Sequence, residues 1–138
     1  GIRDVAVTGV QTCALPISIH FAGWRRDIAP VLAALDIVVL CSDNEGIPLS
    51  LIEASASGVP IVATKVGSVS VVVIDNVNGM LVETSDDALA VGIEKLLADG
   101  KLRDQMGNAG KKITAEKFSI NAAQERHRAM YRRLVNED

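Results

Sequence analysis

Residues 37–64 read IVVLCSDNEGIPLSLIEASASGVPIVAT, and this stretch decides the fold. Ile37–Cys41 is a continuous apolar run, which is typical of a strand buried on both faces of a parallel sheet. A polar loop, Ser42–Ile47, follows it, and a helix is predicted over Pro48–Ser57 because proline suits the first helical turn. Pro60–Thr64 is a second apolar strand. The stretch therefore predicts a strand–loop–helix–strand unit.

The same alternation continues on both sides of this unit. Upstream, Ile19–Gly23 is predicted as a strand ended by glycine, and Ile28–Leu35 carries the apolar spacing of a helix face. Downstream, the pattern predicts a loop with a short helix over Gly67–Ile74, a turn over Asn76–Gly79, and a fourth short strand over Met80–Glu83. Alternating strands and helices favour an α/β fold with a short, doubly wound parallel sheet flanked by helices.

Three further helices are predicted in the C-terminal part, over residues 86–100, 101–117 and 120–134. Ser85 and Ser119 are the expected N-caps, since serine hydroxyls accept bonds from the free amides of a first turn. Gly107 and Gly110 are expected to weaken the second of these helices by about 1 kcal/mol each. The run Gly107–Lys112 has two glycines and two lysines, but it lacks the remaining residues and the preceding strand of a phosphate-binding loop.

The beginning of the chain does not follow this alternation. Val7–Ile17, VTGVQTCALPI, has the period of neither a strand nor a helix, and its Ala-Leu-Pro suits the interior of neither. One ordinary codon choice for this stretch spells a common short-read sequencing adapter. We therefore expect residues 1–17 to be a non-native, irregular arm, which fold reasoning should exclude, and residues 18–138 to be a truncated domain.

The composition indicates an ordinary globular protein, with 49% hydrophobic and 22% charged residues and a net charge of −3 over 138 residues. This mild acidity gives no electrostatic footprint for nucleic acid. No apolar run approaches the roughly 20 residues that cross a bilayer. Cys41, the one cysteine outside the arm, is expected to be a small buried core residue in a reducing, cytoplasmic compartment. No carboxylate or histidine cluster of the metal-binding type occurs.

The loop that follows Ile37–Cys41 carries the candidate chemistry, because ligands of such sheets bind beyond the carboxyl ends of the strands. Gly46 is expected to let the backbone turn sharply. The amides of Ile47, Leu49 and Ser50 lie where the helix begins, so they offer a partly positive seat for a phosphate or for sugar hydroxyls.

Two carboxylates flank this seat. Glu45 precedes it, and Glu53 lies about one and a half turns into the helix. A carboxylate is repelled by a phosphate, so each glutamate is better suited to accept hydrogen bonds from neutral hydroxyls. A nucleotide sugar supplies such hydroxyls on its sugar and on its ribose. The pattern therefore favours a nucleotide-sugar site.

These residues resemble a known family. Glu45 and Glu53, separated by seven residues in S-x-x-E-G-x-P-x-x-x-x-E-A, are similar to the E-x7-E motif of family 4 retaining glycosyltransferases of the GT-B fold. The resemblance extends over most of the chain from Ser18 to about Leu134. It includes FAGWRRDI (21–28), GVPIVAT (58–64), VGSVS (66–70), NGMLV (78–82) and the FS pair before the last helix.

The resemblance implies a role for each part of the site. It assigns Glu45, the expected catalytic residue, to the donor sugar, and Glu53 to the ribose. It assigns the backbone of residues 46–49 (Gly46, Ile47, Pro48 and Leu49) to the sugar and the diphosphate, with N–H donors at every one of these positions except the proline. The Gly23-Trp24-Arg25 loop would lie near the nucleobase. No cofactor is implied beyond the nucleotide diphosphate sugar itself.

The resemblance also implies what the whole enzyme does. It would transfer a hexose-type unit, with retention, to a glycan or lipid-linked acceptor held by an N-terminal domain. It would be cytoplasmic, with peripheral association at the inner face of a membrane. Two family features are expected to be missing: the acceptor domain, and an upstream Arg and Lys that grip the donor diphosphate. Val71 stands where the family usually has an acidic residue.

Other interpretations compete with this one. The chain could come from another GT-B sugar-nucleotide enzyme, such as an epimerase or a phosphorylase, or it could be a non-catalytic flavodoxin-like module. Trp24 could be partial core instead of a platform for the base. Arg25 and Arg26 could be solvated or paired with Asp27. Of the two histidines, His20 is expected to be structural and His127 to lie on the surface.

Overall fold

The structure is a computed structural model that describes residues 21–136. Residues 1–20 lie outside this part. They include the arm over residues 1–17 and the first two residues, Ile19 and His20, of the predicted strand Ile19–Gly23. The last three residues of that predicted strand, 21–23, are not in a strand. Gly23 has a left-handed φ of 65°, which interrupts an extended backbone. For residues 21–23 the strand prediction is therefore wrong.

Three parallel strands form the sheet of the described part. They are β1 (Val38–Leu40), β2 (Ile61–Thr64) and β3 (Gly79–Val82), in the spatial order β1-β2-β3. Ile61 pairs with Val38 on one side and with Gly79 on the other. All four residues of the central strand β2 are buried, as its apolar sequence predicts. The predicted parallel α/β architecture is confirmed, with three strands in place of four.

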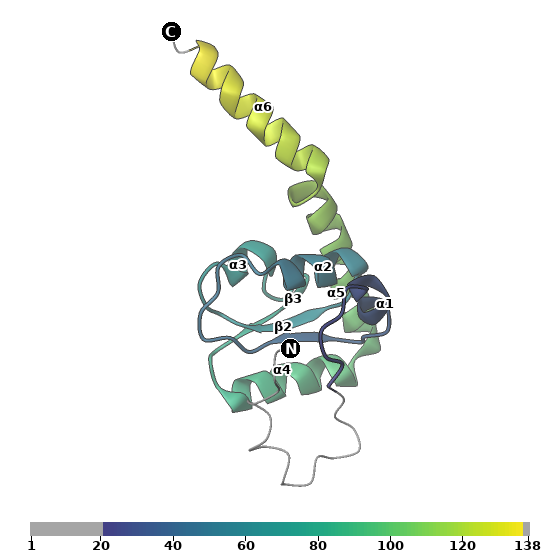
Figure 1. The fold of residues 1–138 in the computed structure, drawn as a ribbon. Helices are drawn as coiled ribbons and strands as arrows, with labels where there is room; N and C mark the ends of the chain where they lie inside the picture. The colour runs from purple at the N-terminus through teal and green to yellow at the C-terminus, as the bar shows by residue number, and fades with distance from the viewer. Residues whose placement is uncertain (1–20, 137–138) are drawn as a thin grey trace.

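Helices cover both faces of this sheet (Figure 1). One face carries α2 (Leu49–Ser57) with α1 (Ile28–Ala33) and α3 (Val69–Val72), and the other carries α4 (Asp86–Ala98). The alternating side chains of β2 divide the core accordingly. Ile61 packs on the α2 side with Leu51 and Val69, while Val62 packs on the α4 side with Leu96.

The predicted helix ends are largely confirmed. Ser85 Oγ accepts a bond from the Ala88 amide at 3.2 Å and begins α4. Ser119 Oγ accepts one from the Ala122 amide at 3.2 Å and begins α6 (Ile120–Asn136). Gly58 ends α2 with a left-handed φ of 81°. Pro48 is the residue that precedes α2 and not its first helical residue.

The first strand is less buried than its sequence predicts. Val39 is 42% exposed, because its side chain alternates with those of Val38 and Leu40 and so points to the face where α4 packs mainly against β2 and β3. Cys41 is exposed, because it follows the last residue of β1 and lies outside the hydrogen-bonded ladder. The predictions that this strand is buried on both faces and that Cys41 is a core residue are therefore wrong.

The two glycines of α5 (Gly100–Lys117) have a packing role that their helix propensity does not predict. Gly107 is buried against the carbonyl group of Gly58, and Gly110 lies against Ser55 on α2. A Cβ atom at Gly107 would overlap the Gly58 carbonyl oxygen. The two glycines lower the helix propensity of α5, but they also allow α5 to lie close to α2.

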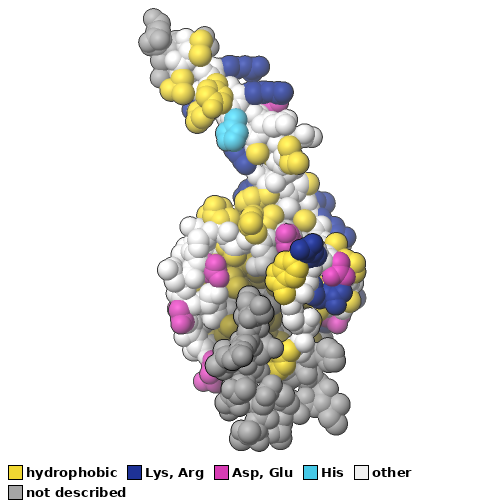
Figure 2. Space-filling model, in the orientation of Figure 1, with side chains coloured by type: hydrophobic (Ala, Val, Ile, Leu, Met, Phe, Trp, Pro, Cys, Tyr) yellow, Lys and Arg dark blue, Asp and Glu magenta, His cyan; other side chains and the backbone are white. Residues whose placement is uncertain are grey.

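The last helix, α6, extends away from the rest of the molecule (Figure 1). Figure 2 shows hydrophobic and basic side chains along this extension. Its large apolar residues include Ile120, Tyr131 and Val135, which are 77%, 63% and 75% exposed. His127 is exposed, as predicted. Within residues 21–136, no helix has the length and apolar character needed to span a bilayer.

Candidate donor-binding site

The candidate site lies at the carboxyl end of the sheet, where two loops are joined. The loop after β1 contains Ser42 and Glu45, and the loop after β2 contains Gly67 and Ser68. Thr64, the buried last residue of β2, donates a hydrogen bond from Oγ1 to the Ser42 carbonyl oxygen at 2.6 Å. The Ser68 amide bonds the Glu45 carbonyl oxygen at 3.3 Å. The end of a buried strand thus fixes the position of the Glu45 loop.

Glycine is required at Gly67 and not at Gly46. Gly67 has a left-handed φ of 47°, and a Cβ atom there would overlap the Glu45 carbonyl oxygen. Gly46 has no left-handed φ, and a Cβ atom there would meet nothing within 4 Å. The backbone does bend at Gly46, as predicted, but the bend does not require glycine there, whereas the close approach of the two loops at Gly67 does.

The side chain of Glu45 is half-buried and held from within its own loop. Ser42 Oγ donates a hydrogen bond to Glu45 Oε1 at 2.6 Å. No hydrogen bond from residues 21–136 reaches its second oxygen, Oε2. A carboxylate held at one oxygen keeps the other available as an acceptor for a hydroxyl group.

The N-terminus of α2 follows this carboxylate directly. No side chain caps it, and no backbone acceptor within residues 21–136 bonds the amides of Leu49 and Ser50. Pro48 is buried, while Ile47 and Leu49 are 54% and 71% exposed. These free amides carry the positive end of the helix dipole. The arrangement is the one that the sequence predicts for an anionic group, whose binding here stays a prediction.

Glu53 lies on the exposed surface of α2, beside a groove of about 420 Å³. This groove runs between α2, α5 and the start of α6, and Lys111 and Phe118 also line it. No hydrogen bond or ion pair within the described residues engages the Glu53 carboxylate, so its carboxylate oxygens are available to hydroxyl groups. Its role toward a ribose stays a prediction.

The predicted nucleobase loop is a surface feature. Trp24 is 80% exposed, so it is not partial core. The Arg26 guanidinium lies over its ring, 5.1 Å from the centroid. Arg25 pairs with Asp27 at 2.6 Å, and this guanidinium holds the pKa of the Asp27 carboxyl below its ordinary value. Within residues 21–136, no hydrogen bond joins this loop to Glu45 or Glu53.

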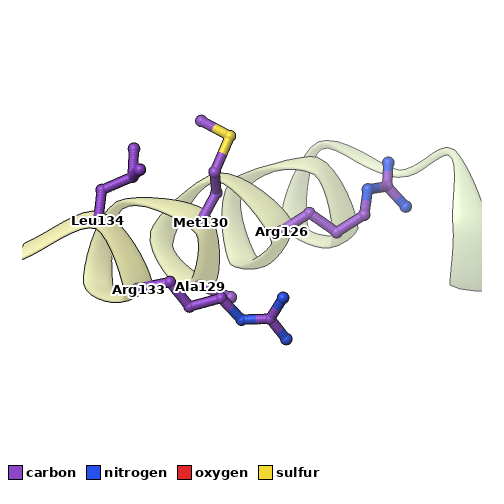
Figure 3. Close-up of a pocket in the computed structure, with 5 residues that line it drawn as sticks. All are labelled: Arg126, Ala129, Met130, Arg133 and Leu134. Atoms are coloured by element: carbon purple, nitrogen blue, oxygen red, sulfur yellow. The ribbon is translucent and has the colours of Figure 1, made fainter. Parts of the chain in front are cut away.

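Two other hollows lie on the surface of the described residues. One is lined by Ile47, Ser70, Val71, Lys117, Phe118 and Arg126, so Val71 lies on an open surface close to the candidate site. The other is a shallow surface between successive turns of α6, lined only by residues of that helix (Figure 3). Because a single helix cannot enclose a ligand, the α6 surface is no substrate pocket. The described residues contain no cluster of metal-ligating side chains.

Comparison with known proteins decides the family. A family model described as glycosyl transferases group 1 matches residues 6–113. The chain belongs to the glycosyl transferase group 1 family. The match begins within residues 1–17, so it gives no support to the adapter interpretation of that arm, which stays a prediction.

A curated relative and two solved structures illustrate the likeness of this group 1 chain. The lipopolysaccharide core biosynthesis glycosyltransferase LpsE of Rhizobium meliloti is 33% identical over 75% of the chain and 31% of its own length. The C-terminal domain of a group 1 glycosyl transferase, LpcC of Francisella tularensis, is 36% identical, with a TM-score of 0.65 over 74% of the chain and 53% of that structure.

The third is HepE of Anabaena, which was solved with UDP. It is 27% identical, with a TM-score of 0.74 over 80% of the chain and 31% of its own length. HepE was also solved with UDP-glucose. The group 1 chain therefore spans less than a third of the length of LpsE and of HepE.

Three residues of the site were not predicted from the sequence: Ser42, Thr64 and Gly67. Ser42 lies inside the motif quoted for the resemblance, three residues before Glu45, but the bond between their side chains could not be read from that spacing alone. Thr64 and Gly67 act across two strands that are adjacent only in the folded sheet. The E-x7-E motif predicted where the candidate site lies, and the fold shows which residues hold its loop in place.

Proposed function

We propose that this chain is the donor-binding part of a retaining glycosyltransferase that uses a nucleotide diphosphate sugar. The whole enzyme transfers a hexose-type unit to a hydroxyl of a glycan or lipid-linked acceptor. Support comes from the family, from the UDP and UDP-glucose held by HepE, and from the likeness to a C-terminal domain. The epimerase-like and flavodoxin-like alternatives are not favoured, since these relatives are glycosyltransferases or sugar-nucleotide binders.

One observation carries the proposal. The uncapped N-terminus of α2 presents the free amides of Leu49 and Ser50 beside the Glu45 carboxylate, at the carboxyl edge of the sheet. In our proposal these amides bind the diphosphate and stabilise the charge that develops on it as the sugar departs. Glu45 binds hydroxyls of the donor sugar, Glu53 binds the ribose, and the Gly23–Arg25 loop lies near the base.

The relative LpsE is named as a glycosyltransferase of lipopolysaccharide core biosynthesis. For the whole enzyme that contains this chain, we propose a glycan or lipid-linked acceptor in the cytoplasm. A lipid-linked acceptor would bring the enzyme to the inner face of a membrane by peripheral association.

The test is a titration of the isotopically labelled chain with UDP-glucose and UDP, followed by amide chemical shifts. We expect weak, millimolar binding, because 1 mM already corresponds to about −4 kcal/mol, while exposed helix-end interactions contribute about 0.3–1 kcal/mol each. Shifts should be largest over residues 45–53 and 23–25. Saturable shifts confined to α4 or α6 would contradict the assignment of the site.

A further inference from the structure

The hydrogen bond from Ser42 to Glu45 joins two side chains of one loop. It is short, 2.6 Å, and its acceptor is a carboxylate oxygen, so it belongs to the stronger charge-assisted class. Serine has one hydroxyl proton to donate, and here that proton is committed to Oε1 of Glu45.

The backbone of Ser42 is itself anchored. Its carbonyl oxygen accepts the 2.6 Å bond from Thr64 Oγ1, and Thr64 is fully buried at the end of the central strand. The Glu45 backbone is held separately, by the Ser68 amide and by the close approach of Gly67. The main chain at both residues is therefore fixed without the Ser42 hydroxyl.

What the hydroxyl adds is the orientation of the carboxylate. A glutamate side chain has three rotatable bonds, and the half-buried Glu45 has no other hydrogen-bond partner among residues 21–136. A single bond at Oε1 selects one rotamer and leaves Oε2 for a ligand. Groups that bind a transition state act best when they are oriented before the ligand arrives.

We propose that Ser42 is a positioning residue for the donor sugar, and that it acts by fixing the Glu45 carboxylate so that Oε2 accepts a sugar hydroxyl. This inference rests on the proposed function, because it assigns the sugar contact to Glu45. It adds a residue whose own side chain touches no substrate.

The first experiment needs no ligand. Side-chain couplings and the carboxyl carbon shift of Glu45 are measured by NMR in the wild-type chain, in Ser42→Ala and in Ser42→Thr. We expect one dominant Glu45 rotamer in the wild type, averaging among rotamers in Ser42→Ala, and restoration in Ser42→Thr, which keeps the hydroxyl. An unchanged Glu45 rotamer in Ser42→Ala overturns the inference.

The matched control is Ser70→Ala, which removes the hydroxyl of an exposed serine on α3. It should leave the Glu45 rotamer unchanged. The melting temperature of Ser42→Ala should stay close to that of the wild type, because the bond from Thr64 to the Ser42 backbone is retained. A large drop in its melting temperature together with wild-type Glu45 couplings would assign Ser42 to the stability of the loop instead.

The second experiment separates this inference from the proposed function. The dissociation constant of UDP divided by that of UDP-glucose isolates the contribution of the sugar, because it rises as the sugar contributes more to binding. We expect Ser42→Ala to reduce this ratio by up to roughly tenfold, the size of one charge-assisted hydrogen bond, with little change in the binding of UDP. Equal weakening of both ligands would contradict a positioning role. A wild-type chain that binds neither ligand would contradict the proposed function, and the rotamer experiment would still decide the inference.

Discussion

Gly107 on α5 lies against the carbonyl group of Gly58, the residue that ends α2. Gly58 follows directly on the helix that carries Glu53, so the contact fixes the distance between the candidate site helix and α5. The same pair of helices also meets at Gly110 and Ser55. Small residues on both sides allow this approach, and a side chain added at Gly107 or Gly110 would push the helices apart.

Gly107→Ala should destabilise the chain. Alanine improves helix propensity by about 1 kcal/mol, but its methyl group would overlap a backbone oxygen, and such overpacking costs roughly 1–3 kcal/mol or more. The clash should win, because a backbone carbonyl cannot rotate away as a flexible side chain can. The measurement is the free energy of unfolding by chemical denaturation.

Gly100→Ala is the control for this change. Gly100 lies in the same helix, and the nearest atom to an added Cβ is Arg103 Nη2, at 3.7 Å. We expect an unchanged or slightly higher stability. If both alanine variants gain stability equally, the contact of Gly107 with Gly58 contributes nothing to the free energy of unfolding.

Asn78→Ala should also lower the free energy of unfolding, by roughly 1–3 kcal/mol for the buried groups left without a partner. Asn78 is 1% exposed. Its side chain accepts a bond from the Ile74 amide at 2.7 Å and donates to Ser55 Oγ and the Val72 carbonyl oxygen at 3.2 and 3.0 Å. Asn108→Ala, at an exposed position of α5, should change little, and an equal loss in both variants would refute the role of this network.

Gly67→Ala should disturb the Glu45 loop. The left-handed φ of Gly67 is unfavourable for alanine, and the added methyl group would overlap the Glu45 carbonyl oxygen. We expect lower stability, altered amide shifts over residues 42–48, and weaker binding of UDP-glucose. Ser68→Ala is the neighbouring control, because the Ser68 side chain makes no capping bond to α3. Wild-type shifts over residues 42–48 in Gly67→Ala would disprove the coupling of the two loops.

Much of the fold could be predicted because its signals are local. Residues 37–64 contain a strand, a helix and a second strand within one short span. The apolar runs of the two strands are longer than those usually found in a solvent-exposed loop. The caps at Ser85 and Ser119 depend only on a hydroxyl and on the amide three residues later. Gly58 ends its helix through its own backbone conformation.

The errors concern features that depend on distant neighbours. The exposure of Val39 follows from the placement of α4 over β2 and β3, and that of Cys41 from the end of β1 at Leu40, and an apolar run reveals neither. The packing role of Gly107 depends on Gly58, far away in the sequence. For the site, the spacing of Glu45 and Glu53 indicated the chemistry, whereas the support from Thr64 and Gly67 required the pairing of β1 with β2.

The two glutamates should differ in what they bind. Glu53→Gln should weaken UDP and UDP-glucose alike, by roughly 1–3 kcal/mol for a charge-assisted bond to the ribose that both ligands share. Glu45→Gln should weaken UDP-glucose and leave UDP nearly unchanged, because only the sugar reaches it. In the whole enzyme, Glu45→Gln should lower turnover more than donor affinity, since sugar positioning matters most at the transition state. Titration calorimetry or amide shifts measure the binding, and a coupled assay of UDP release measures turnover.

Glu94→Gln, at an exposed position of α4, is the matched charge control and should change the binding of neither UDP nor UDP-glucose. If Glu45→Gln weakens the binding of UDP and Glu53→Gln leaves it unchanged, the two roles are reversed, and the ribose lies at the end of β1 beside Glu45.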